Sequence, residues 1–324
     1  MELVSSPLVP DGFKVPSTRW KHGSARLREL LKEKPYVFGP GVYDPHGAQL
    51  LMYHGFDAVY FSGYSFAVGH LGTTDMDVGY GNIFNVQRTT ELYVNTGVAA
   101  AHIEDQVMPK RCGHIAGKAL VSADEMVGKL RMMRNVADDL GHRDFIIIAR
   151  TDGVSASEAP EATSGIELAI DRGLRYLDSG VPDLLWCEFP TAARGPVEQF
   201  TQEIRKRFPD ARFAFNYSSS FKWQNEKDPM TFDELGEMGV GFLFITLAMQ
   251  HAAGYGMSEV LTSLKERKEQ GYIELQRREW DPAKDIPTKS HHLFTGVPYH
   301  HHLGESYGAR GMGVSEGLAK ELVV

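Results

Sequence analysis

Cysteine, long apolar runs and basic charge are all scarce in this sequence of 324 residues. Two cysteines are too few for a disulfide framework, which favours a reducing compartment. The longest apolar runs, such as 145–149, fall far short of the roughly 20 residues that a membrane span needs. A formal net charge of -8 argues against nucleic acid as a partner, because binding it favours a basic face. The first 13 residues carry no basic segment followed by an apolar one, so no signal peptide is predicted. We therefore expect a soluble, cytoplasmic protein with no membrane and no nucleic-acid partner.

Short β-branched or aromatic runs alternate with longer helical patterns along most of the chain. This alternation is typical of βα units and a parallel sheet. Apolar residues recur at helical spacing in 24–34, 122–140 and 166–177. The predicted strands are 36–38, 58–62, 99–103, 145–150, 184–188, 212–216 and 241–246. Seven strands are one fewer than an α/β barrel of the (β/α)8 TIM type requires.

The gap in this pattern lies between the second and third predicted strands. Ser62 and Asp75 are only 13 positions apart, whereas a βα unit with its next strand takes roughly 30 residues. We therefore expect a TIM-type barrel in which the third βα unit is lacking or degenerate. The barrel and an N-terminal helix should occupy residues 1–271. Residues 272–324 are rich in proline, glycine and histidine, and we expect them to form an irregular C-terminal arm.

Polar or reactive side chains end nearly every predicted strand. The carboxyl ends of parallel barrel strands converge on one face, where enzymes of this architecture keep their sites. Polar residues also cap strand ends and helices, and this structural interpretation is the better one for Asp105 or Asp152 taken alone. The strand-end segments are Ser62-Gly63-Tyr64, His102-Ile103-Glu104-Asp105, Arg150-Thr151-Asp152, Trp186-Cys187-Glu188, Asn216-Tyr217-Ser218-Ser219-Ser220 and Thr246.

Three carboxylates form a candidate metal site. Asp75 and Asp77 are two positions apart, and Glu104 ends the third predicted strand. Hard cations such as Mg²⁺ bind few carboxylates and keep several waters, so this oxygen-rich set suits Mg²⁺. An Asp-x-Asp pair in a solvated loop would look the same.

The segment Lys110-Arg111-Cys112-Gly113-His114 is the sharpest local motif. Cationic neighbours favour the thiolate and should lower the pKa of Cys112, which suits it to exchange a proton with a carbanion. The alternative, a free cysteine that acts as a small hydrophobic residue, fits Cys187 in its strand better. Four short neutral side chains could hold a carboxylate without neutralising it, although a Ser-rich turn or helix cap would also explain them. They are Asn216, Ser218, Ser220 and Thr246.

Together these motifs resemble the isocitrate lyase and phosphoenolpyruvate mutase superfamily over residues 37–270. His102-Ile103-Glu104-Asp105-Gln106 followed by the Cys112 motif is similar to the lyase branch, which uses a catalytic cysteine. Asn216-x-Ser218-x-Ser220-Phe221-x-Trp223 and Phe244-Ile245-Thr246-Leu247-Ala248 resemble isocitrate lyases in particular.

This resemblance implies a function for each site residue. Asp75, Asp77 and Glu104 would hold Mg²⁺ or Mn²⁺, and Ser62, Gly63 and Tyr64 would hold glyoxylate, with Arg150 at its carboxylate end. Gly113, His114, Asn216, Ser218, Ser220 and Thr246 would hold succinate, and Cys112 would protonate its carbanion. His102 and Trp186 are further candidates, and either Glu188 or Tyr64 would remove the hydroxyl proton.

The implied reaction is retro-aldol cleavage of isocitrate, a tricarboxylate, into glyoxylate and succinate. The family's C-terminal arm packs on a neighbouring subunit, so a homo-oligomer, a tetramer, is expected. Two alternatives stay open. The enzyme could be a 2-methylisocitrate lyase, which releases pyruvate and succinate, because a pocket distinguishes one methyl group by only about 1–3 kcal/mol. The missing unit would also fit a non-catalytic paralogue.

Overall fold

The structure is a computed structural model that describes residues 23–61, 76–295, 297, 304, 306 and 307. The chain divides into two compact units. One spans Lys21–Ala252, and the other contains Ala253 and the residues that follow. None of the helices in the described ranges combines the length and apolarity that crossing a bilayer would require.

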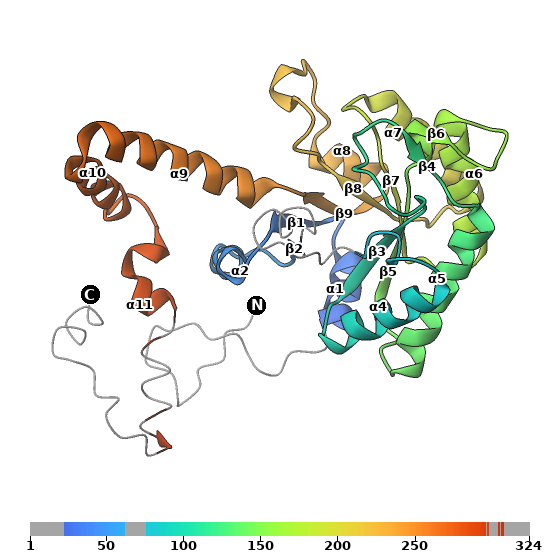
Figure 1. The fold of residues 1–324 in the computed structure, drawn as a ribbon, viewed down its shortest axis with the longest axis horizontal. Coiled ribbons are helices and arrows are strands. Elements are labelled where there is room, and N and C mark those ends of the chain that lie inside the picture. Colours follow the sequence, from blue (N-terminus) through green and yellow to red (C-terminus); the bar gives the residue numbers. More distant parts are fainter. Residues whose placement is uncertain (1–22, 62–75, 296, 298–303, 305, 308–324) are drawn as a thin grey trace. The chain divides into compact units, whose positions relative to one another are not determined.

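Seven parallel strands form the central sheet of the first unit, in the order β2-β1-β9-β8-β7-β5-β3 (Figure 1). All seven strands predicted from the sequence are present, and two residues of β2 are among the described ones. The curled parallel sheet with helices packed on it confirms the TIM-type fold class. The strands are β1 (Val37–Val42), β2 (Tyr60–Phe61), β3 (Ala100–Glu104), β5 (Ile146–Thr151), β7 (Leu184–Cys187), β8 (Phe213–Asn216) and β9 (Val240–Ile245).

The two ends of this sheet, β2 and β3, flank the position where the sequence predicts a lacking or degenerate unit. Residues 62–75 lie outside the described residues, so that prediction remains one. The chain is described again from Met76, and the carbonyl of Asp77 accepts a hydrogen bond from the Glu104 N–H at 2.9 Å. Helix α4 (Ile83–Asn95) follows, and Asn82 and Asn85 cap its start through reciprocal side-chain to backbone bonds.

Alternate residues of each strand face opposite sides of the sheet, and the two sides bury different neighbours. The inner side collects a cluster that includes Ile148, Trp186 and Phe244. The outer side collects a larger cluster in which Ile147 and Cys187 pack with the helices. This alternation decides which strand-end side chains can meet inside the curled sheet.

Helices cover the outer side because each carries an apolar stripe at helical spacing. In α5 the stripe is Met126, Leu130 and Met133, all fully buried, and the Ser122 hydroxyl caps its first turn. Each such buried side chain contributes roughly 1.5–3 kcal/mol. The helices of this unit are α1 (Gly23–Glu33), α2 (Pro45–Tyr53), α4, α5 (Ala123–Asp139), α6 (Gly165–Asp178), α7 (Arg194–Arg207) and α8 (Phe232–Glu237).

Helix α1 closes the end of the sheet where the strands begin. Leu30 packs into the inner cluster with Ile146 and Leu184, which lie at the starts of their strands. The guanidinium of Arg28 donates to a carboxylate oxygen of Asp183 at 2.7 Å. The opposite end, where the strands finish, is therefore the end left for a site.

The second unit begins within α9 (Ala248–Arg267) and continues with α10 (Glu269–Glu279) and the short α11 (His291–Phe294). A Cβ on Gly271 would lie 2.6 Å from the Ser263 backbone, so α9 and α10 approach closely where the chain reverses. No described residue of α9 is buried. The predicted arm is therefore helical at its start, and the boundary predicted at residue 271 falls inside α10; it stays a prediction.

Candidate active site

Strand register brings a set of polar side chains together at the carboxyl end of the sheet. Glu104 pairs in register with Arg150, and Arg150 with Trp186. Each of these three residues is an even number of positions from a residue of the inner cluster on its own strand, so it faces the inner side. The same holds for three residues at or just after the ends of their strands, Glu188, Asn216 and Thr246. The alternation that buries apolar residues on the inner side thus points these polar side chains into the same space.

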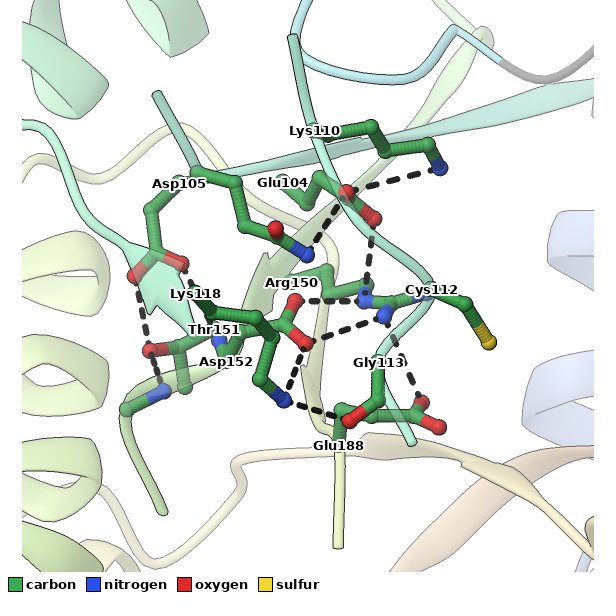
Figure 2. Close-up of polar contacts among 12 residues, drawn as sticks. Glu104, Asp105, Lys110, Cys112, Gly113, Lys118, Arg150, Thr151, Asp152 and Glu188 are labelled. Atoms are coloured by element: carbon green, nitrogen blue, oxygen red, sulfur yellow. Dashed lines mark hydrogen bonds and ion pairs between the residues drawn. The ribbon is translucent and has the colours of Figure 1, made fainter. Parts of the chain in front are cut away.

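Arg150 lies at the centre of this group and is almost fully buried (Figure 2). Its guanidinium donates to both carboxylate oxygens of Asp152, at 2.9 and 3.1 Å, and lies 3.2 Å from Glu104 and 3.8 Å from Glu188. It also stacks over the Trp186 ring at 4.4 Å. Burial lowers the pKa of Arg150, but the carboxylates of Asp152, Glu104 and Glu188 outweigh it and raise the pKa well above its usual range. Arg150 therefore carries a fixed positive charge.

A buried lysine completes the group and was missed by sequence reasoning. The Lys118 ammonium, 1% exposed, donates to Asp152 at 3.1 Å, to the Ser155 hydroxyl at 2.7 Å and to the Gly113 carbonyl. Burial raises the pKa of Asp152, but Arg150 and Lys118 lower it by more. The only signal in the sequence was a lysine fourteen residues after the strand that ends in Glu104, which looks like any solvated lysine.

The segment 107–117, here called the cysteine loop, leaves and re-enters the fold at one place. Gln106 and Leu120 form an isolated antiparallel bridge, and the Val107 N–H donates to the Ala119 carbonyl at 2.7 Å. The Gln106 side chain exchanges two hydrogen bonds of 2.9 Å with the backbone of Arg111. Strands β4 (Lys118–Ala119) and β6 (Ala156–Glu158) then pair beside it. The loop is thus fixed at its base while its tip reaches the strand ends.

Gly113 is the point where the cysteine loop touches the centre of the site. A Cβ at this position would lie 2.5 Å from the Arg150 guanidinium, 2.6 Å from Glu188 Cγ and 3.1 Å from Asp152. The first two distances are shorter than real Cβ contacts, so a larger residue at this position would have to displace the loop or its neighbours. The backbone of the loop therefore lies directly against the charged group.

Cys112, His114 and Glu188 form a chain from the loop tip to a strand end. Cys112 Sγ lies 4.0 Å from His114 Nδ1, and His114 Nε2 lies 3.2 Å from a Glu188 carboxylate oxygen. The contact with His114 lowers the pKa of the exposed Cys112 thiol, against the opposing effect of burial. The same contact raises the pKa of His114. Burial raises the pKa of Glu188, although Arg150 opposes it. The arrangement can hold and move a proton near neutral pH.

Two carboxylates of the predicted metal set lie close to one cation. The Lys110 ammonium contacts Asp77 Oδ1 and lies 3.4 Å from Glu104 Oε1. Asp77 has φ 49°, a left-handed conformation that aspartate tolerates, and Lys129 donates to the next carbonyl, that of Val78, at 3.1 Å. The two oxygens face a common positive group, and oxygen donors are what Mg²⁺ prefers, so the set fits a hard cation. Among the described residues no three His, Cys, Asp or Glu side chains converge as a metal cage, and Asp75 lies outside them.

The neutral side chains predicted to hold a carboxylate occupy the ends of β8 and β9. The Thr246 hydroxyl donates to the Asn216 side-chain oxygen at 2.8 Å. The buried Ser218 hydroxyl accepts from the Ser220 N–H at 3.1 Å, and Ser220 is exposed. The serines therefore form a turn directly after β8, and Ser218 lies two residues beyond Asn216 at the carboxyl end of that strand.

Comparison with known proteins assigns the chain to a family. A family profile described as phosphoenolpyruvate phosphomutase matches residues 68–265. The isocitrate lyase of Haloferax volcanii is 36% identical, over 91% of this chain and 90% of that protein. The chain belongs to the phosphoenolpyruvate mutase/isocitrate lyase superfamily. The fold and the resemblance that the sequence motifs indicated are thereby confirmed.

Other members of the superfamily act on different small carboxylates. The 2,3-dimethylmalate lyase of Eubacterium barkeri is 32% identical, over 75% of this chain and 86% of that protein. A crystal structure of a 2,3-dimethylmalate lyase aligns with a TM-score of 0.72 at 26% identity, over 91% of this chain and 99% of that one. A structure of an oxaloacetate acetylhydrolase aligns with a TM-score of 0.70 at 27% identity, over 90% and 98% of the two chains. These relatives show that this chain is an enzyme of a superfamily of carbon–carbon lyases.

Two candidates lie deeper in the fold than the rest. His102 is one inward position below Glu104 and packs between Tyr60 and Trp186, at ring distances of 6.2 and 4.8 Å. Trp186 is 3% exposed and packs edge-on to Phe244. Both rings therefore belong to a cluster of aromatic side chains that lies against Arg150. Their contact with substrate stays a prediction.

Asp105 and Cys187 have the opposite parity and face the helices. Asp105 accepts from the Thr151 hydroxyl at 2.7 Å, from Arg172 at 3.0 Å and from the Tyr176 hydroxyl at 2.7 Å. Cys187 is buried in the outer cluster, where burial raises its pKa well above its usual range. The structural interpretation of Asp105 and of Cys187 is confirmed. Ser62, Gly63 and Tyr64 of the predicted glyoxylate group lie outside the described residues.

Proposed function

We propose that this enzyme is an isocitrate lyase that cleaves isocitrate into glyoxylate and succinate and depends on Mg²⁺ or Mn²⁺. The observation that supports it most is the Cys112–His114–Glu188 chain held against Arg150. This arrangement sets a thiol of lowered pKa near Arg150, whose positive charge could bind a substrate carboxylate. The identity with the Haloferax volcanii isocitrate lyase over nearly the whole chain points the same way.

Asp77 and Glu104, with Asp75, would hold the divalent cation. When bound, the cation supplies Lewis-acid stabilisation to the oxygen that becomes the glyoxylate aldehyde. Arg150 offers a permanent positive charge to the glyoxylate carboxylate, and its ion pairs with Asp152 and Glu104 hold it in place. The residues thus orient the end of the substrate that leaves as glyoxylate.

The proton steps fall to Glu188 and Cys112. A base removes the proton of the substrate hydroxyl, and the bond between the hydroxyl-bearing carbon and its neighbour then breaks. Glu188 is the candidate base among the described residues, because its raised pKa brings it closer to neutrality. The electron pair of the broken bond remains on the succinate carbon, and the Cys112 thiol donates a proton to it. Asn216, Thr246 and the other neutral donors would hold the succinate carboxylate.

A lyase whose substrate carries extra methyl groups is the second candidate. The similarity to two 2,3-dimethylmalate lyases supports this second candidate, and 2-methylisocitrate differs from isocitrate by one methyl group. A non-catalytic paralogue is the third, because residues 62–75 leave no room for an ordinary βα unit. Placement in the glyoxylate cycle, in the cytoplasm and in a homotetramer belongs to the same proposal and rests on the resemblance.

A glyoxylate-trapping assay on purified protein separates these functions. With Mg²⁺, we expect isocitrate to be cleaved with a kcat/KM at least about tenfold above that of 2-methylisocitrate or 2,3-dimethylmalate. Exhaustive chelation should stop turnover, and Mn²⁺ should restore it. Faster cleavage of a methylated substrate would reassign the enzyme within the superfamily. No cleavage of any of the three would favour the paralogue, and full turnover after chelation would remove the cation from the proposal.

A further inference from the structure

Lys110 links the candidate cation site to the cysteine loop. It belongs to the loop, two residues before Cys112, yet its ammonium lies between the carboxylates of Asp77 and Glu104. Its side chain is 25% exposed, that of Asp77 is 17% exposed, and that of Glu104 is fully buried. These ion pairs are therefore partly shielded from bulk water. Fully exposed ion pairs, by contrast, contribute little free energy. Figure 2 shows Lys110 reaching from the loop to Glu104.

A second contact ties the same carboxylate to the loop. The Gln106 side-chain amide donates to Glu104 Oε1 at 3.2 Å and to the Arg111 carbonyl at 2.9 Å. Glu104 Oε1 is therefore shared by two groups that hold the backbone of the cysteine loop. Whatever changes the partners of this oxygen changes how the loop is held.

A divalent cation and the Lys110 ammonium compete for the same two carboxylate oxygens. The Lys110 ammonium contacts Asp77 Oδ1 and Glu104 Oε1, and a cation on these oxygens would be repelled by it, because like charges within a few ångströms repel strongly in a shielded site. The guanidinium of Arg150 already contributes positive charge 3.2 Å from the other Glu104 oxygen. Binding of a divalent cation to these oxygens and binding of the Lys110 ammonium therefore oppose each other.

We propose that Lys110 is an intrinsic cation latch, which occupies Asp77 and Glu104 when no divalent cation is bound and is displaced when one binds, so that cation binding releases the tip of the cysteine loop. Lys110 acts as a positioning residue, because it works through the carboxylates and the loop. The inference rests on the proposed function only in taking Asp77 and Glu104 as cation ligands. By thermodynamic linkage, the latch must weaken cation binding by the same factor by which the cation loosens the latch.

The latch can be tested by two measurements that do not require catalytic turnover. Titration of the metal-free protein with Mn²⁺, followed by electron paramagnetic resonance, gives the cation affinity. Lys110→Met should bind Mn²⁺ on the order of tenfold more tightly than the parent protein. Hydrogen exchange of residues 107–117 should accelerate in the parent when Mg²⁺ is added. In Lys110→Met it should already be fast and should not respond to Mg²⁺.

Three variants serve as controls. Arg111→Gln removes the same charge one residue further along the loop, from a side chain that donates to the Ala116 carbonyl, and should leave Mn²⁺ affinity unchanged. Lys110→Arg keeps the charge and should bind Mn²⁺ as the parent does, and Lys110→Gln replaces Lys110→Met if the latter unfolds. Equal or weaker Mn²⁺ binding by the neutral Lys110 variants would overturn the latch while leaving the proposed function intact. A parent protein that binds no Mn²⁺ would overturn the cation assignment and the latch together.

Discussion

Cys112 and Cys187 differ in the properties that govern thiol reactivity. Cys112 is exposed beside His114, which lowers its pKa, whereas Cys187 is buried among apolar side chains, which raise its pKa. Only a thiol that exchanges its proton near neutral pH can take part in acid–base chemistry there. The two residues therefore form a natural pair of test and control within one chain.

Replacing Cys112 by serine should lower kcat by about 100-fold or more, because a serine hydroxyl is too weak an acid near pH 7. The fold and the cation affinity should be unchanged. Cys187→Ser should retain most of the activity. Steady-state kinetics with isocitrate measures both. Alkylation of Cys112 that goes to completion without inhibition would show that the thiol has no part in the reaction.

The lowered pKa of Cys112 also predicts a pH dependence of its reactivity. Only the thiolate is alkylated, so the rate of iodoacetamide labelling should rise with pH through a midpoint below that of an ordinary thiol. His114→Gln removes the contact that lowers the pKa, so the midpoint should move upward. Mass spectrometry of the labelled peptide follows Cys112 alone. An unchanged midpoint in the variant would show that His114 does not control the thiol.

Gly113 offers the strongest steric test of the site. In Gly113→Ala the new methyl group would overlap Arg150 and Glu188, so the loop or the guanidinium must shift by about an ångström. A displacement of that size can cost about 100-fold in rate, and we expect such a loss of kcat/KM with little change in the midpoint of urea unfolding. Gly195→Ala is the control, because a Cβ at Gly195 has no neighbour within 4 Å.

Single residues show what sequence can and cannot predict about the site. Cys112 was distinguished from Cys187 by its neighbours in the chain, and local neighbours also decide the pKa of a thiol at a loop tip. The Lys118 to Asp152 pair was missed because its partners are 34 residues apart and meet only through β4, β6 and the end of β5. Long-range pairs of this kind leave no periodic or local pattern.

At the scale of elements, the seven strands were predictable because buried parallel strands are short continuous apolar runs. Helix α4 was missed, since its buried stripe is only half apolar and its start is marked by asparagine caps; the stripe consists of Val86, Thr89, Thr90 and Val94. The β4–β6 pair was also missed, because a two- or three-residue strand carries no alternation. The strand-end side chains Glu104, Arg150 and Glu188 lie close together as expected, because register and alternation follow from the apolar pattern, while their roles stay predictions.

Asp105 joins three elements, β3, β5 and α6, and should matter for stability more than for chemistry. It accepts from Thr151, Arg172 and Tyr176, and all four side chains are buried. Asp105→Asn leaves the Arg172 charge with one carboxylate partner fewer, and should lower the free energy of unfolding by about 3 kcal/mol. Glu203→Gln, which breaks an exposed pair with Lys206, should change it little. Urea unfolding measures both, and equal effects would contradict the assigned role.

At the scale of the whole molecule, the helical second unit carries apolar side chains in contact with solvent. Tyr255, Met257 and Leu261 on α9 are 69%, 57% and 65% exposed. Such a helix is costly to leave in water, which supports the proposed homo-oligomer. Deleting residues 290–324 should yield monomers or aggregates with little activity. Light scattering that finds a stable, active monomer of the intact chain would contradict the oligomer.

The alternation of inner and outer side chains along β5 has a consequence for how this gene can vary. Ile146, Ile148 and Arg150 face inward, while Ile147, Ala149 and Thr151 face the helices. Deleting one codon inside this strand would keep its composition and length nearly intact, yet it would point the guanidinium at the helices and a threonine into the candidate site. In a library of single-codon deletions, we therefore expect deletions within the strands of the central sheet to abolish function. This should hold even at apolar positions where substitution by another apolar residue is tolerated.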